Sequence, residues 1–359
     1  MKRIIAVILA LVMTAALLTG CGKKAAEPSA ESPSPSPSPS QTAAPMINPL
    51  TGETVDGDIS TVRPYAIMIN NISVAQPQVG VSNADIIYEV LAEGGITRMM
   101  AIFDSVKGID KIGSMRSLRP YYLSISMSYD AITVHAGGSE QAYSDVKSLN
   151  ADDIDGVRGS FASGTFFRDK SRQKYGIEHS LFAAGSGIIE TTAQKGFRTE
   201  HDSGYDTSYK LSFSDTAADQ CTDKAGYVKV IYNSGKNTSF VYDDASGLYT
   251  AYQYGGTYTD NKEKDMTFKN VLVLFADTKT VDSYGRLAVN LIGSGEGYFC
   301  CGGKYVPITW QRSDTGSSFS YKLKDGTPLD FGIGKSFISV VPTNGTFGSS
   351  VVFKEAYTA

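Results

Sequence analysis

The chain has 359 residues, of which 42% are hydrophobic and 19% are charged, and its formal net charge is -4. This length and apolar content are sufficient for a large core and for two domains. A surface without a basic excess has no general attraction to nucleic acid, so we expect no nucleic-acid partner. The 21 tyrosines, 16 phenylalanines and 36 glycines favour strands and turns, which argues against an all-helical fold.

Residues 1–21 have the pattern of a bacterial lipoprotein signal peptide. Two basic residues precede an apolar run at 4–18, and the sequence LTGC that ends at Cys21 resembles a lipobox. The apolar run is short for a membrane span and the four-residue box fits, which together favour lipidation over a transmembrane anchor or an ordinary secretory leader. We therefore expect lipid on Cys21 to hold the chain at the outer face of the bacterial cytoplasmic membrane.

Residues 22–47 are predicted to be a disordered Ser/Pro-rich tether. The alternating Ser-Pro run at 32–39 cannot build a helix or a sheet ladder and favours extended polyproline geometry. We interpret it as a spacer that lifts the folded part off the bilayer. Recognition by a proline-binding domain is the alternative.

Residues 48–204 are predicted to form a mixed α/β module. The apolar run at 63–70 is typical of a buried strand. The runs at 86–93 and 96–103 flank Gly94-Gly95, which indicates a hairpin, because primed turns need positive φ. These three runs supply the first strands of the module.

The stretch from Ile112 to Glu140 continues this module. Pro120 fits the first turn of a helix that reaches Tyr129, and residues 131–135 form the next strand. Gly137-Gly138 follows, and Ser139 then caps a helix over 140–149. Beyond this, 161–178 has weak periodicity and is expected to be an irregular, partly buried loop region.

Residues 205–359 are predicted to form a β-rich module. Alternating apolar runs predict eight strands, with turns at Ser234-Gly235, Gly255-Gly256, Gly302-Gly303 and Asp325-Gly326. The runs are 227–232, 238–242, 248–254, 271–275, 287–292, 298–306, 319–324 and 336–341. Short strands at this spacing suggest a sandwich- or barrel-like module, so the expected fold class of the whole chain is α+β.

Several ordered motifs resemble the YerB family of bacterial lipoproteins. They are NPLTG at 48–52, RP at 63–64, NN at 70–71, ADIIYE at 84–89, EGGITR at 93–98, RSLRP at 116–120, HAGGS at 135–139 and VPITW at 306–310. These motifs span nearly all of the chain beyond the tether. The resemblance implies a two-module extracytoplasmic lipoprotein of unestablished activity, so it supplies no catalytic residues.

Arg116 and Arg119 lie three residues apart at the expected start of a helix. Free N–H groups and the helix dipole favour an anion there, and two guanidinium groups can clamp a phosphate or a carboxylate. The alternative is that one or both pair with a local acid such as Asp85, Glu89 or Asp104. We predict that Arg116 and Arg119 bind a ligand.

His135 ends a strand just before Gly137-Gly138, where the backbone could approach a ligand at a carboxyl-end crevice. A histidine in such a place is either a general base or donor, or a hydrogen-bonded structural residue. With Arg168 from the irregular region, His135 completes the predicted ligand-binding set. If the protein is an enzyme, the candidates are His135 as base with Glu140, Asp169 or His179 as its partner.

The sequence lacks the spacing of a zinc site or a nucleophile elbow, so we expect no metal and no other cofactor. Asp152, Asp153 and Asp155 lack the full EF-hand spacing, and we interpret them as a solvated loop. Beyond Cys21 there are three cysteines, so a disulfide of Cys221 with Cys300 or Cys301 would leave one thiol.

The expected function is a non-enzymatic, membrane-anchored protein that binds an anionic cell-envelope component or a partner protein through the N-terminal module. One alternative is a hydrolase or transferase acting on envelope polymers with His135 as general base. Another is assembly through the β-rich module.

Overall fold

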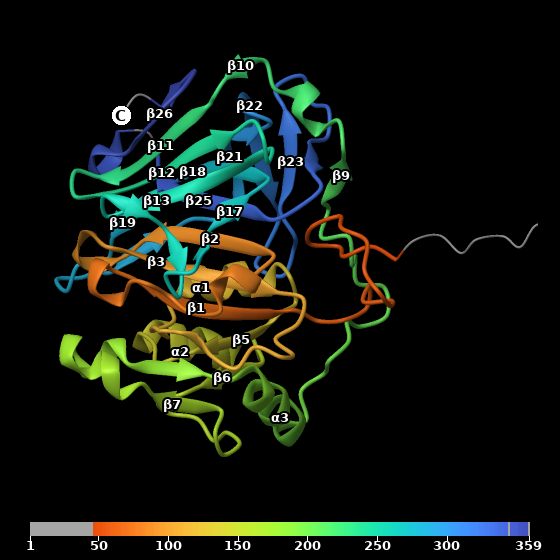
Figure 1. The fold of residues 1–359 in the computed structure, drawn as a ribbon. Coiled ribbons are helices and arrows are strands. Elements are labelled where there is room, and N and C mark those ends of the chain that lie inside the picture. The colour runs from red at the N-terminus through yellow and green to blue at the C-terminus, as the bar shows by residue number, and fades with distance from the viewer. Residues whose placement is uncertain (1–45, 344, 358–359) are drawn as a thin grey trace, which may run out of the picture. The chain divides into compact units, whose positions relative to one another are not determined.

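The computed structural model describes residues 46–343 and 345–357, drawn as a ribbon in Figure 1. The predicted signal peptide, Cys21 and nearly all of the predicted tether lie outside the described residues. The described residues belong to one compact unit. Within the described ranges, no helix is long and apolar enough to cross a membrane.

The α-helices begin and end where the sequence supplies capping residues. They are α1 (Pro120–Met127), α2 (Glu140–Ser148) and α3 (Gly185–Lys195). Pro120 occupies the first turn of α1, Ser139 Oγ accepts from Ala142 N at 3.2 Å before α2, and Gly196 ends α3 with a φ of 67°. Short 3₁₀ segments are η1 (Ser73–Ala75), η2 (Val81–Asn83), η3 (Glu93–Gly95), η4 (Lys170–Tyr175), η5 (Ile177–His179), η6 (Ala217–Gln220) and η7 (Thr346–Gly348).

The strands account for most of the regular structure. They are β1 (Tyr65–Asn71), β2 (Ile86–Leu91), β3 (Thr97–Phe103), β4 (Ile112–Gly113), β5 (Ile132–His135), β6 (Asp153–Asp155), β7 (Phe166–Arg168), β8 (Leu181–Ala183), β9 (Ser212–Ser214), β10 (Asp223–Lys224), β11 (Tyr227–Asn233), β12 (Lys236–Asp243), β13 (Leu248–Gln253), β14 (Gly256–Thr257), β15 (Thr259–Asp260), β16 (Lys264–Asp265), β17 (Thr267–Phe268), β18 (Asn270–Ala276), β19 (Thr278–Thr280), β20 (Leu287–Val289), β21 (Gly293–Cys301), β22 (Lys304–Arg312), β23 (Ser320–Leu323), β24 (Asp330–Gly332), β25 (Ser336–Pro342) and β26 (Ser350–Lys354).

The largest sheet has 11 strands and combines strands from both predicted modules. Its order is β10-β22-β21-β18-β25-β2-β3-β1-β5-β6, and β23 pairs with β22. Strand β25 lies between β18 and β2 and runs parallel to both, with Ser336 opposite Asn270 on one side and Ile86 on the other. One of the last strands of the chain therefore joins the N-terminal and C-terminal parts in a single hydrogen-bonded sheet.

The large sheet is covered on both faces, because side chains alternate along its strands. In β18, Val271 and Val273 pack in one buried cluster, whereas Leu272 packs in the other. The six-stranded sheet β14-β13-β12-β11-β26, with β17 beside β13, covers the first face through residues such as Val228. Helix α1 covers part of the second face through Tyr122.

The predicted α+β class is confirmed, with mixed sheets in both parts and no closed barrel among the described strands. The expected hairpin at 86–103 is present, although its connection is longer than two residues and contains η3. The strand predicted at 298–306 is wrong. It spans the Gly302-Gly303 turn, where both residues have positive φ, between β21 and β22.

Candidate functional site

The end of β1, the start of β3 and the start of α1 meet at one place. Asn70 and Arg98 are opposite each other in the antiparallel pair of β1 and β3, so their side chains lie on the same face. Arg116 donates its backbone N–H to Met68 O at 3.1 Å, which holds the segment before α1 beside β1. We refer to Asn70, Glu93, Arg98, Arg116 and Arg119 as the α1 cluster.

Glu93 pairs with two arginines of this cluster. Its Oε1 accepts from Arg98 Nη2 at 2.6 Å and from Arg119 Nη2, and its Oε2 accepts from Arg119 Nε at 3.1 Å. Burial by itself raises the pKa of Glu93, but the hydrogen bond from Arg119 and the charges of Arg98 and Arg119 lower it to about 2. One ionised carboxylate therefore accepts hydrogen bonds from two guanidinium groups, and the side chain of Arg119 already has an ion-pair partner within the protein.

Arg116 is the arginine of the cluster whose side chain is left without a partner. Within residues 46–343 and 345–357 it makes no side-chain hydrogen bond or ion pair, and its Nε is buried without a partner. Burial lowers the pKa of Arg116, and the nearby charge of Arg98 lowers it further. The group nevertheless stays protonated at neutral pH, because arginine starts from a pKa above 12. The cluster thus holds three guanidinium groups and one buried carboxylate.

Buried acceptors surround the end of β1 beside Arg116. Asn70, Gln78 and Ser114 are each 0% exposed, and Asn70 Oδ1, Gln78 Oε1 and Ser114 Oγ have no hydrogen-bond partner among the described residues. Gln78 Nε2 donates to Asn70 O at 2.6 Å, and Asn70 N donates to Ser114 O at 2.9 Å, so the three residues are neighbours. Buried polar atoms are normally satisfied by protein groups or by water, which makes this gathering unusual.

His179 borders the same place. Its Nδ1 lies 2.9 Å from Asn70 Nδ2, and its Nε2 lies 3.6 Å from Glu178 Oε1. Burial lowers the pKa of His179, while Glu178 raises it and Arg116 lowers it. The ring is therefore neutral at pH 7, and Nδ1 accepts from the amide of Asn70.

His135 has the contacts of a hydrogen-bonded structural residue, the second of the two interpretations that the sequence left open. It is 0% exposed, its Nδ1 lies 2.8 Å from Gly137 O, and its Nε2 lies 3.0 Å from Asp153 Oδ2. Asp155 Oδ1 is 3.8 Å from Nδ1. Both ring nitrogens are engaged by neighbours, so the glycine turn after β5 presents no free imidazole nitrogen.

The other candidates make separate contacts. Glu140 accepts from Arg158 Nη2 at 2.8 Å on the surface, and Asp169 accepts from Lys111 Nζ at 2.5 Å. Arg168 Nη1 donates to Ile177 O at 2.5 Å and thus holds the loop that carries His179. Among the described hydrogen bonds and ion pairs, none links His135 with Glu140, Asp169 or His179.

Two of the acids expected to compete for Arg116 and Arg119 have other partners. Asp85 accepts from Asn48 Nδ2 at 3.0 Å and from Asp104 N at 2.7 Å, and Glu89 pairs with Lys236. The actual partner of Arg119 is Glu93, which lies in the turn after β2.

The interpretation of the acidic run 152–155 as a solvated loop is wrong. Residues 153–155 form β6 beside β5, and Asp155 is only 3% exposed. The parallel pairing places Asp155 opposite His135, which explains its burial. A short acidic strand with few apolar residues lacks the alternation by which strands are recognised in a sequence.

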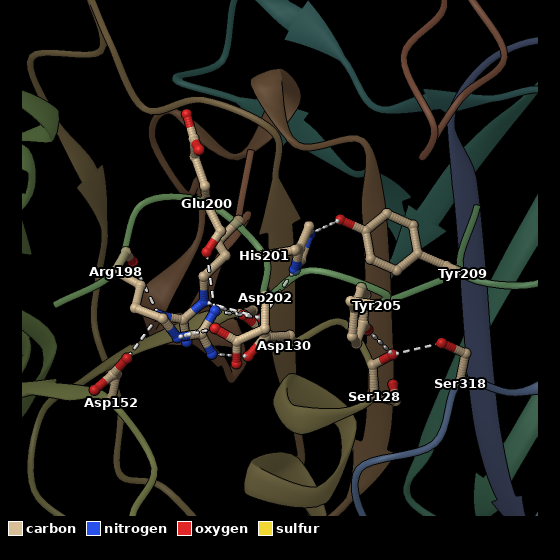
Figure 2. Close-up of polar contacts among 12 residues, drawn as sticks. Ser128, Asp130, Asp152, Arg198, Glu200, His201, Asp202, Tyr205, Tyr209 and Ser318 are labelled. Atoms are coloured by element: carbon tan, nitrogen blue, oxygen red, sulfur yellow. Dashed lines mark hydrogen bonds and ion pairs between the residues drawn. The ribbon is translucent and has the colours of Figure 1, made fainter. Parts of the chain in front are cut away.

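A second polar cluster was missed by sequence reasoning and is shown in Figure 2. Asp130 Oδ2 lies 2.9 Å from His201 Nδ1, and Arg198 donates to both oxygens of Asp130 at 2.8 and 3.1 Å. His201 Nε2 lies 2.8 Å from the Tyr209 hydroxyl, and the Tyr205 ring stacks on the imidazole with centroids 4.4 Å apart. No local spacing could have revealed this cluster, because 68 to 71 residues separate Asp130 from its partners.

A cavity of about 420 Å³ lies beside this second cluster and is lined by Arg63, Asp130, Asp152, Arg198 and Tyr205 among others. Its charged side chains are already paired: Arg63 Nη1 donates to Asp152 at 2.6 Å, and Arg198 pairs with Asp130. A ligand would have to displace these ion pairs. These ion pairs hold residues 198–209 against the N-terminal part of the chain.

Across the part of the chain that the structure describes, no group of three or more His, Cys, Asp or Glu side chains is arranged to hold a metal ion. Three buried cysteines are free thiols.

Comparisons with known proteins agree on one family. Residues 50–198 match the N-terminal domain, and residues 228–338 the C-terminal domain, of a protein family of unknown function, DUF3048. The chain is 30% identical over 331 residues to YerB of Bacillus subtilis (strain 168), which is named as a lipoprotein; the match covers 91% of this chain and 92% of the relative. The crystal structure of YerB from Bacillus subtilis matches with a TM-score of 0.73 at 29% identity, over 86% of this chain and 99% of that one.

The resemblance drawn from the sequence motifs is therefore confirmed. The chain belongs to the YerB family of proteins, which are built from the two DUF3048 domains.

Proposed function

We propose that this protein is a lipid-anchored protein of the cell envelope that binds a phosphate-bearing envelope component through the α1 cluster. The observation that carries the proposal is the side chain of Arg116, which has no partner among the described residues and lies beside two arginines that share one carboxylate. The lipobox at Cys21 and the lipoprotein name of the Bacillus subtilis relative support the anchor. They also support a location on the outer face of the cytoplasmic membrane.

The chemistry of the cluster favours a compact anion. Arginine presents a planar set of N–H donors that matches phosphate or carboxylate, and it does so with a permanent charge. Arg98 and Arg119 raise the local positive potential, because the single carboxylate of Glu93 neutralises only one of their two charges. The net charge of -4 for the whole chain argues against a long polyanion groove, but a local positive site is compatible with it.

The surrounding acceptors fit a hydroxylated phosphate. Asn70 Oδ1 and Ser114 Oγ are buried without partners close to Arg116, and they could accept hydrogen bonds from ligand hydroxyls. A polyol phosphate supplies both the anion and the hydroxyl groups. Inorganic phosphate alone would leave these acceptors unused and is expected to bind more weakly.

Catalysis by His135 is supported less well. A general base needs a ring nitrogen that can reach substrate, and both nitrogens of this 0% exposed histidine already have partners. Binding of a partner protein at the α1 cluster remains the alternative function. An acidic side chain of the partner would then occupy the place of the phosphate.

The test uses the full mature chain with Cys21→Ser, so that the protein stays unlipidated. Calorimetric titration with poly(glycerol phosphate), and sedimentation with phosphatidylglycerol vesicles, separate a polymer from a lipid as the source of phosphate. Arg116→Gln is expected to weaken binding about tenfold, a typical effect of removing one charge-assisted contact. Lys324→Gln is the matched control, because it removes the same charge from an exposed lysine paired with Glu296.

Binding should also weaken with added salt, since the interaction is between charges. Equal affinities for Arg116→Gln and Lys324→Gln would show that the α1 cluster is not the site. If neither phosphate source binds, while acidic proteins of the envelope are captured in an Arg116-dependent way, the partner-protein alternative is correct.

A further inference from the structure

Three loops from separate parts of the chain surround the end of β1. The loop at 72–77 follows the strand directly. The second loop contains His179 of η5, whose Nδ1 lies 2.9 Å from Asn70 Nδ2. The third is the turn between β13 and β14, where the Tyr254 hydroxyl donates to Asn71 O at 2.6 Å. These loops are therefore attached to the same strand end that supplies Asn70 to the α1 cluster.

Arg172 of η4 connects two of these loops. Its guanidinium group donates to three successive backbone oxygens of the first loop, those of Ala75, Gln76 and Pro77. Arg172 is only 9% exposed, so these hydrogen bonds are largely shielded from water. The segment 170–179 is thus fixed beside the loop that follows β1.

Each of the three loops presents apolar side chains to solvent. Val74 of η1 is 41% exposed, Tyr175 of η4 48%, Ile177 of η5 55%, and Tyr254 in the β13–β14 turn 44%. Single exposed apolar side chains are common and need no explanation, but these four lie on loops that are fixed to one strand end. We refer to the four side chains as the β1 rim.

The surroundings of the β1 rim are positively charged, although the whole chain has a net charge of -4. The segment 168–179 contains four basic and two acidic residues, a net charge of +2. The α1 cluster has three arginines and one glutamate, which gives a further +2. Lys170 and Lys174 are exposed, and Lys174 Nζ lies 4.9 Å from the centre of the Tyr175 ring. Basic residues interspersed with exposed aromatic and aliphatic side chains are typical of surfaces that lie on anionic membranes.

The lipid anchor makes a membrane the favoured occupant of this surface. The lipobox at Cys21 and the lipoprotein name of the Bacillus subtilis relative support the anchor. The predicted tether at 22–47 reaches at most several tens of ångströms, because an extended chain of this composition rises about 3.1 Å per residue. The bilayer therefore stays within reach of the folded part, and a high effective concentration favours even a weak contact.

We infer that the β1 rim enters the interface of an anionic membrane while Arg116 binds the phosphate of a lipid head group. This inference rests on the proposed function and selects a lipid, in preference to a polymer, as the source of the phosphate. Tyr175 and Tyr254 suit the interface, because a tyrosine has an apolar ring and a polar tip. Val74 and Ile177 add apolar area that is removed from water.

The experiment sediments the full mature chain with Cys21→Ser together with vesicles. Vesicles of phosphatidylglycerol mixed with phosphatidylcholine should bind more tightly than phosphatidylcholine alone, and added salt should weaken the binding. Tyr175→Ser combined with Ile177→Ser should weaken binding about tenfold or more, because two apolar side chains no longer enter the bilayer. Tyr284→Ser combined with Val281→Ser is the matched control. It removes side chains that are 69% and 54% exposed from the β19–β20 connection and should have no effect.

A second measurement reports on the position of the β1 rim. An environment-sensitive dye attached to Ile177→Cys should shift its emission to shorter wavelength when anionic vesicles are added, because the dye enters apolar surroundings. The same dye on Val281→Cys should not shift. Cys221, Cys300 and Cys301 are buried, so the dye reacts with the introduced thiol. An unshifted emission at residue 177 in the presence of bound vesicles would overturn the inference.

Titration with poly(glycerol phosphate) separates this inference from the proposed function. The variant with Tyr175→Ser and Ile177→Ser should bind the polymer as the parent does, because Arg116 is unchanged. If the polymer depends on Arg116 but vesicles bind this variant as tightly as the parent, the inference is wrong and the proposed function stands. If neither polymer nor vesicle binding depends on Arg116, the proposed function fails and the inference fails with it. Equal losses in the variant and in its matched control would also contradict the inference.

Discussion

Lys236 of β12 and Glu89 of β2 form a buried ion pair, with 3.0 Å between Nζ and Oε1 and side-chain exposures of 3% and 0%. The pair connects the six-stranded sheet to the large sheet. Glu89 also accepts from Asn71, Thr97 and Thr238, so the carboxylate is well satisfied by hydrogen bonds. Burial lowers the pKa of Lys236, whereas the charge of Glu89 raises it.

Breaking this pair on one side should destabilise the protein strongly. Lys236→Met leaves a buried carboxylate without its cation, and the free energy of unfolding is expected to fall by about 3–5 kcal/mol. Urea unfolding followed by fluorescence measures the change. The double variant Lys236→Met with Glu89→Gln should recover part of the loss, because no charge then remains buried. If the double variant loses as much free energy of unfolding as the two single variants added together, the pair is not coupled.

Asp85 should make stability fall as the pH rises. Burial and the nearby charge of Asp104 raise the pKa of Asp85 to about 7, whereas an unfolded aspartate titrates near 3.9. The folded state then binds a proton that the unfolded state releases, so this contribution is complete below about pH 4 and is lost as the pH passes through about 7. Urea unfolding at pH 4.5 and 7.5 should show a decrease on the order of 1–3 kcal/mol that Asp85→Asn abolishes. An identical pH dependence in parent and variant would contradict the assignment.

The three cysteines should be unreactive in the folded protein. Cys221, Cys300 and Cys301 are buried free thiols, and burial raises the pKa of Cys221 to about 12, so little thiolate exists at neutral pH. Cys300 and Cys301 also point into opposite faces of β21, as expected for neighbours in a strand. With Cys21→Ser, a thiol reagent should titrate no cysteine in buffer and three in denaturant. Only one reactive thiol in denaturant would indicate a disulfide.

Asp130 should contribute to the attachment of residues 198–209. It accepts from His201 and Arg198 (Figure 2). Arg63 Nε also donates to its backbone oxygen. Asp130→Asn removes the charge that both partners face, and we expect a loss of about 1–3 kcal/mol and faster proteolysis within this segment. Asp202→Asn, which changes an exposed acid 3.6 Å from Arg198, is the matched control. Equal proteolysis rates in the two variants would show that Asp130 has no special part in this attachment.

Much of the local structure could be predicted from the sequence, because it depends on nearby residues. Pro120 and Ser139 marked the starts of α1 and α2, and apolar runs marked β1, β3 and β18. The turn expected at Gly255-Gly256 is shifted by one residue. Tyr254 and Gly255 form it, since the register of β13 places Gln253 opposite Gly256.

The candidate site was predicted in part for the same reason. Arg116 and Arg119 stand in one short motif at a helix start, so local spacing was enough to select them. Asn70 and Glu93 come from a strand end and a separate turn. The pairing of β1 with β3 places Asn70 opposite Arg98, whose guanidinium group contacts Glu93. His135 was selected on its position after a strand, but its burial depends on β6, which the sequence pattern does not reveal.

The place of β25 in the large sheet has a consequence for how the chain acquires its structure. Its neighbours β2 and β18 begin at Ile86 and Asn270, so each has one unpaired edge until the residues from Ser336 onward are available. Pairings over such sequence distances form late and slowly, and unpaired edges favour association with other chains. The large sheet can therefore be completed only when nearly the whole polypeptide has been synthesised. A chain shortened before residue 336 would leave the edges of β2 and β18 unpaired and prone to aggregation.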